Sequence, residues 1–153
     1  MNGLETVLAN HAFTSRMNSR YIRKLAECAS YLEIPAGQYV FRQGESAQVF
    51  YLILDGSVEI ELFSSTGGPV VLQKIDVGAA LGWSWLVPPC RWRFDARVVK
   101  AVKALKIDTT RLRTLMEEEP AFGYEILERF LHLMGERLES ERMSLVELYA
   151  AHS

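Results

Sequence analysis

Three tryptophans lie within one short stretch of the chain, and their chemistry is the first indication of function. Trp83, Trp85 and Trp92 are all the tryptophans present, and Arg91 and Arg93 flank the last of them. An indole face beside a guanidinium can stack on a planar ligand or help to hold an anion. The pattern therefore predicts a binding pocket or, as the alternative, core side chains that plug an abandoned one.

The rest of the sequence offers few residues that could form an acid–base, nucleophilic or metal site. The histidines are His11, His132 and His152, all in segments expected to be helix or tail, and no His-x-His pair occurs. Because a catalytic metal needs about three convergent ligands, no metal site is predicted, and an enzyme on a cupin-like barrel is the less favoured alternative. Asp55 is assigned to an Asp-Gly turn, and Cys90 has no histidine placed to act as a base. The chain is predicted not to be an enzyme.

Composition describes an ordinary globular domain. The chain has 153 residues, of which 49% are hydrophobic and 24% charged, with a formal net charge of −2. This charge disfavours a general nucleic-acid-binding surface, which usually needs a basic excess. No stretch reaches the roughly 18 apolar residues of a membrane span and no signal peptide begins the chain, so a cytoplasmic location is expected. Cys28 and Cys90 match no zinc or redox spacing and are expected to be free thiols.

Glycines at turn spacing indicate a run of short strands in the middle of the chain. The glycines are Gly37, Gly44, Gly56, Gly78 and Gly82. Each is expected where the chain reverses, because glycine takes positive φ at little steric cost. Residues 1–33 have helical periodicity, and 34–108 alternate like half-buried strands, with two separate segments between Phe94 and Ile107. The predicted class is α+β: a small antiparallel β-barrel flanked by N-terminal helices and a long C-terminal helix.

Residues 109–150 are predicted to be helical, with an N-cap at Asp108, a short helix that reaches Met116, and a break at Glu117-Glu118-Glu119-Pro120 before a second helix over 121–149. Leucines and a methionine recur there at alternating steps of four and three, the spacing of a heptad seam, with Glu141 as the one polar residue at a seam position. The seam residues are Leu127, Leu131, Met134, Leu138, Leu145 and Leu148. The favoured interpretation is a homodimer through this helix; the alternative is a helix packed on its own barrel.

The segment from Ile34 to Ile107 resembles the cyclic-nucleotide-binding domain of catabolite-activator-type regulators, kinase regulatory subunits and gated channels. The matching pieces are Pro-Ala-Gly (35–37), Arg-Gln-Gly-Glu (42–45), Tyr-Leu-Ile-Leu-Asp-Gly-Ser-Val (51–58), Gly78 with Gly82, and Ala-Val-Lys-Ala-Leu-Lys-Ile-Asp (101–108). The resemblance implies a double-stranded β-helix, or jelly-roll, barrel over 34–108. With its flanking helices it covers 1–153 as a single domain.

That family binds its ligand in a phosphate-binding cassette, which the resemblance places at residues 78–96. A family glutamate takes the ribose hydroxyl and a family arginine pairs with the cyclic phosphate. Here Trp83 stands at the glutamate position, Arg93 at the arginine position with Arg91 as the fallback, and Phe94 replaces a small residue. An indole N–H cannot accept a hydrogen bond as a carboxylate does. The ligand-binding candidates are Gly82, Trp83, Ser84, Trp85, Arg91, Arg93 and Phe94, and the implied ligand is a cyclic nucleotide or another small anion.

The resemblance implies a non-catalytic regulatory sensor or adaptor domain that signals through its C-terminal dimerisation helix. The alternative is a protein-interaction scaffold that has lost nucleotide binding. Regulators of this kind carry a helix-turn-helix domain after the long helix, and the chain stops at Ser153. The expected partners are therefore a second copy of the chain and a regulatory protein, with neither DNA nor membrane bound directly. The basic cluster Arg16, Arg20, Arg23 and Lys24 is assigned to a solvated helix face, with an acidic partner as the alternative.

Overall fold

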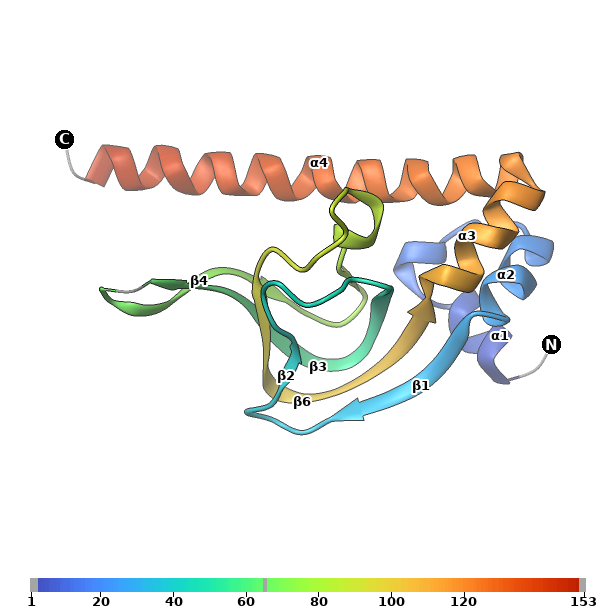
Figure 1. The fold of residues 1–153 in the computed structure, drawn as a ribbon, viewed down its shortest axis with the longest axis horizontal. Coiled ribbons are helices and arrows are strands. Elements are labelled where there is room, and N and C mark those ends of the chain that lie inside the picture. The colour runs from blue at the N-terminus through green and yellow to red at the C-terminus, as the bar shows by residue number, and fades with distance from the viewer. Residues whose placement is uncertain (1–2, 65, 152–153) are drawn as a thin grey trace.

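A computed structural model describes residues 3–64 and 66–151, in which a curved β-sheet lies beneath one long helix (Figure 1). The helices are α1 (Gly3–Ala9), α2 (Ser19–Ala26), α3 (Thr109–Glu118) and α4 (Pro120–Ala151), and two 3-10 turns are η1 (Ala12–Thr14) and η2 (Ser84–Leu86). The strands are β1 (Ala29–Ile34), β2 (Tyr39–Phe41), β3 (Val49–Ser64), β4 (Gly68–Ile75), β5 (Ala80–Leu81) and β6 (Asp95–Asp108). The short helices α1, α2 and α3 gather near the N-terminal end of α4.

The sheet is antiparallel and has the order β1-β6-β3-β4, with β2 added to β6 and β5 added to β3. The two long strands, β3 and β6, pair along most of their length. The expected α+β fold, an antiparallel sheet flanked by N-terminal helices and a long C-terminal helix, is confirmed. Asp108 caps α3 as predicted, accepting from Thr110 N at 2.9 Å, and α3 runs to Glu118, past the predicted end at Met116.

Two element predictions are wrong, and both errors come from pairing between distant segments. The sequence pattern predicts helix for residues 29–33, but Ala29–Ile34 is strand β1, paired residue by residue with the end of β6. The two segments predicted between Phe94 and Ile107 form the single strand β6. The secondary structure of both segments is decided by the strands they pair with and not by local periodicity. Those partner strands are distant in sequence, so the local pattern does not reveal them.

Gly56 lies inside β3, and the predicted chain reversal at this position is wrong. Its φ is 91°, and a Cβ built there would lie 2.2 Å from the carbonyl oxygen of Ala101 in β6. The register between the two strands shifts on both sides of this residue. Gly56 therefore makes a β-bulge that lets the long strand bend around the core while the backbone of β6 approaches closely.

One face of α4 packs against the sheet and the other faces outward. Phe122, Ile126 and Phe130 have no exposed surface, and Phe130 meets the ring of Phe50 edge-on at 4.9 Å. Leu131 and other seam leucines are exposed. The helix therefore carries one buried apolar stripe and a second stripe whose leucines are exposed.

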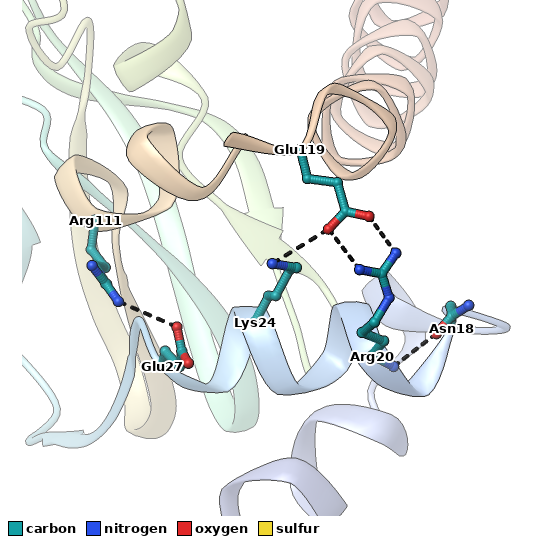
Figure 2. A network of polar contacts seen from close by, with 6 residues as sticks. All are labelled: Asn18, Arg20, Lys24, Glu27, Arg111 and Glu119. Carbon is teal, nitrogen blue, oxygen red and sulfur yellow. Dashed lines mark hydrogen bonds and ion pairs between the residues drawn. The ribbon is translucent and has the colours of Figure 1, made fainter. Parts of the chain in front are cut away.

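Ion pairs join α2 to the residue between α3 and α4 (Figure 2). Arg20 forms a two-pronged contact with the Glu119 carboxylate, one prong being Nη1 to Oε2 at 3.0 Å, and Lys24 Nζ lies 3.3 Å from Oε2. Arg111 of α3 pairs with Glu27 at 3.4 Å beside them. Arg20 and Lys24 thus find an acidic partner within the chain, while Arg16, Arg20 and Arg23 are exposed on the solvated face predicted for them.

We expect Glu119→Gln to lower the urea midpoint at neutral pH and to leave it nearly unchanged near pH 3. The hydrogen bond from Arg20, with help from Lys24, lowers the pKa of the Glu119 carboxyl from its ordinary value. A lowered folded-state pKa contributes stability above the unfolded-state pKa of about 4.3, and this stability is lost as the pH falls through the folded-state value. Glu118→Gln, at an exposed neighbour, is the matched control. Equal midpoints for Glu119→Gln and wild type at pH 7 would contradict the expectation.

Candidate ligand site

The loop between β5 and β6 forms one wall of the candidate site. Gly82 has a φ of 99°, and a Cβ there would lie 2.8 Å from the ring of Trp92. The Trp92 ring is 5% exposed and stacks on Phe41, with centroids 3.8 Å apart and planes inclined by 7°. Glycine is required at position 82 because the indole occupies the space of a side chain, and the stacked pair makes an ordered aromatic wall.

Trp85 lies in the hydrophobic core. Its side chain is 1% exposed, stacks on Phe50 at 5.7 Å and meets Phe130 of α4 edge-on at 5.4 Å. The guanidinium of Arg113 in α3 lies 5.2 Å from the indole centroid and donates to the Trp85 carbonyl. Trp85 therefore joins the cassette to both C-terminal helices.

The two arginines of the cassette have different surroundings. Arg91 is exposed and donates from Nη1 to the Gly44 carbonyl at 2.9 Å, which joins the cassette to the segment before β3. Arg93 is also exposed; its Nη2 donates to the Pro88 carbonyl at 3.3 Å, and its Cζ lies 5.6 Å from the centroid of Trp83. Arg93 thus forms a cation–aromatic contact with Trp83.

A cavity of about 430 Å³ lies between the cassette, the sheet and α4. Small-molecule sites typically span roughly 300–1,000 Å³. Five of the predicted site residues line it: Gly82, Trp83, Ser84, Arg93 and Phe94. Trp85 and Arg91, the other two, lie outside this lining.

The opposite wall of the cavity comes from α4. It includes Leu131, Met134 and Leu138, three residues of the predicted seam, and also Arg137. The sequence-based prediction missed Arg137, although its spacing carried a signal. It follows Phe130 and Leu133 at helical steps on the barrel-facing stripe, where a charged side chain is unexpected.

The seam residues of α4 are uncovered in the single chain. Leu127 is 47% exposed, Leu131 71%, Leu138 68% and Leu145 63%, while Met134 is half-buried. Leu148 lies in α4, but its side chain is outside the described part of the structure. The described leucines of the seam are thus largely uncovered in the single chain, although Leu131 and Leu138 face the cavity, and the contact with a second copy stays a prediction.

Other candidate chemistry does not assemble. His11 is buried, accepts from Phe13 N at 3.0 Å and lies 3.2 Å from the Ile53 carbonyl, while His132 is exposed and pairs with Glu136. His152 lies outside the described residues. In the described ranges, no three His, Cys, Asp or Glu side chains gather in a way that could hold a metal ion, and no helix has the length and apolarity to cross a bilayer. Cys28 and Cys90 are free thiols, and burial raises the pKa of Cys28 to about 12.

Comparison with known families decides what this barrel is. The family model of the cyclic nucleotide-binding domain matches residues 31–119, more than half of the chain. The chain belongs to the cyclic nucleotide-binding domain family. The resemblance predicted from the glycines and the cassette is confirmed, and the antiparallel sheet beneath α4 is the jelly-roll barrel of this family.

Relatives of this cyclic nucleotide-binding domain include bacterial regulators. The CRP-like cAMP-activated global transcriptional regulator of Mycobacterium tuberculosis is 23% identical over 145 residues, which cover 95% of this chain and 63% of the regulator. A cyclic nucleotide-binding domain from Methylobacillus flagellatus has a TM-score of 0.80 at 16% identity, covering 94% of this chain and 81% of that one. The c-di-GMP responsive global regulator CLP of Xanthomonas campestris has a TM-score of 0.74 at 19% identity, covering 86% of this chain and 65% of that one. The chain thus spans less than two thirds of the length of either regulator.

Proposed function

We propose that this domain is a non-catalytic cytoplasmic sensor, in which a small ligand bound in the cavity acts on the α4 surface that forms a homodimer. The observation that carries the proposal is that three side chains belong both to the cavity lining and to the predicted heptad seam. Leu131, Met134 and Leu138 line the cavity and also belong to the predicted heptad seam. A ligand in the cavity therefore contacts the residues that would meet a second copy, so binding energy can bias the dimer contact.

The first ligand class to test is the cyclic nucleotides. Family membership supports this choice, and similar regulators are described as cAMP-activated and as c-di-GMP responsive. In this cassette Arg93 would hold the cyclic phosphate as a charged donor. Trp83 stands where the family has a glutamate, so the ribose hydroxyl loses an acceptor, and losing a charged hydrogen bond costs about 1.5–3 kcal/mol.

Thermal unfolding with saturating cyclic AMP, cyclic GMP or cyclic di-GMP tests the ligand. A ligand at about 100 times its Kd adds roughly 2.7 kcal/mol, which for this chain length raises Tm by about 5–11 °C. The shift should disappear in Arg93→Ala and persist in Arg91→Ala, because Arg91 is also exposed but does not line the cavity. A shift that survives Arg93→Ala would contradict the assigned phosphate contact.

The second candidate function is a protein-interaction scaffold that has lost nucleotide binding. The observation that favours it is that Trp85 and Trp92 are 1% and 5% exposed and pack against Phe50 and Phe41. Under this function no cyclic nucleotide shifts Tm, yet α4 still forms a dimer. The 430 Å³ cavity beside the packed tryptophans favours the sensor over the scaffold.

A further inference from the structure

Arg137 has an unusual position for a charged side chain. The stripe of α4 that faces the barrel runs through Phe130 and Leu133, and Arg137 comes next, where the helix meets the cavity. The side chain is half-buried, and its Nη2 donates to the carbonyl of Ala80 in β5. Burial lowers the pKa of this guanidinium to about 10, and the nearby Glu141 carboxylate offsets only part of that effect. The charge of Arg137 is therefore incompletely compensated by its surroundings.

No carboxylate forms an ion pair with Arg137 within the described part of the chain. The ion pairs found there all involve other cations, and Glu141, one turn further along α4, is exposed and lies at the cavity without forming one. A guanidinium has five N–H donors, and the bond to Ala80 uses one. Among the described side chains, the buried nitrogens without a partner belong to Trp85 and Arg129, so no nitrogen of Arg137 is both buried and unpartnered.

The rest of the cavity is suited to an apolar body. Phe41, Leu81, Trp83 and Phe94 line it from the barrel and the cassette, and leucines and a methionine line it from α4. Such walls favour an aromatic or aliphatic group, which gains by leaving water. Besides Arg137, the polar side chains of the lining are those of Gln73, Ser84, Arg93 and Glu141. Most of the wall therefore offers no partner to the hydroxyls and ring nitrogens of a nucleotide, which need hydrogen bonds when buried.

We infer that the cavity binds an amphipathic organic carboxylate, with its apolar body against the aromatic wall and its carboxylate on Arg137. A carboxylate accepts two parallel N–H bonds from a guanidinium, a geometry that a lysine ammonium does not reproduce. The anchor then lies on α4 itself, next in sequence to Leu138 of the seam. This inference rests on the proposed function, since it names the ligand class of the same sensor site.

Calorimetric titration with indole-3-acetate and 4-phenylbutyrate, each paired with its neutral amide, tests the inference. Both acids should bind wild type at least about tenfold more tightly than their amides. Arg137→Met keeps most of the side-chain length without the charge and should weaken acid binding at least about tenfold, while amide binding stays within about threefold. Arg137→Lys should restore part of the acid affinity. Arg142→Met, at an exposed arginine of the same helix, is the control and should match wild type.

Three results would overturn the inference: equal binding of acid and amide, unchanged acid binding in Arg137→Met, or no saturable binding of either acid up to about 1 mM. If Arg137→Met does not fold, the ratio of acid affinity to amide affinity in wild type and in Arg137→Lys decides whether the inference holds. A cyclic-nucleotide shift without acid binding would leave the proposed sensor standing and remove this ligand class. Acid binding without any change in self-association would keep the ligand class and remove the coupling to α4.

Discussion

Gly56→Ala is expected to lower the free energy of unfolding by about 3 kcal/mol or more, enough to unfold a large share of a marginally stable domain. The added methyl would overlap the Ala101 carbonyl oxygen, 2.2 Å from the ideal Cβ position, and the φ of 91° is unfavourable for alanine. The two strands that meet here form the longest pairing in the sheet, so neither can move without disturbing the barrel. Urea unfolding followed by circular dichroism measures the loss.

Gly135→Ala is the matched control for this expectation. Gly135 lies inside α4, and a Cβ there meets nothing within 4 Å. Alanine should therefore stabilise the helix by roughly 0.5–1 kcal/mol. A loss at Gly56 no larger than about 1 kcal/mol, the usual effect of a substitution, would show that β3 and β6 can separate at the bulge.

Leu145→Glu is expected to convert the proposed dimer into a monomer and to raise its Kd by roughly 100-fold or more. Leu145 is 63% exposed in the single chain and does not line the cavity, so the substitution acts on the seam and leaves the ligand site alone. Paired carboxylates at a heptad core position lose water and repel each other. Sedimentation equilibrium over a concentration series measures the change.

Val146→Glu places the same charge one residue further along, off the heptad seam. Val146 is 56% exposed, so the two substitutions share a comparable environment in the monomer. We expect Val146→Glu to keep the wild-type association constant, because its position lies outside the a/d seam. A monomeric wild type at high concentration, or equal effects of the two substitutions, would exclude the seam as the dimer contact.

Much of the fold follows from signals within a few residues. Asp108 before a helical pattern marks the start of α3 as predicted, and Pro120 after the three glutamates separates α3, which ends at Glu118, from α4. The apolar spacing of α4 likewise predicts one long helix. Local capping and periodicity depend on neighbours in sequence, so one sequence by itself can reveal them.

Five of the seven predicted ligand-binding residues line one cavity, and ligand binding there stays a prediction. Trp83, Arg93 and Phe94 line the cavity. Trp85 is two residues from Trp83 and of the same type, yet it lies in the core. Arg137, far from Arg93 in the sequence, lines the same cavity. Which side chain turns inward and which helix supplies the opposite wall depend on packing between segments that are distant in the chain.

The sequence by itself determined the barrel family, the long helix and the apolar seam, because glycine spacing and heptad spacing are local properties of the chain. Tertiary structure alone decided that residues 29–34 are a strand and that Gly56 bends β3 without a reversal. It also decided that a half-buried arginine on α4 lines an apolar cavity. Strand pairing and burial are set by long-range contacts, and these contacts exist only once the whole chain has folded.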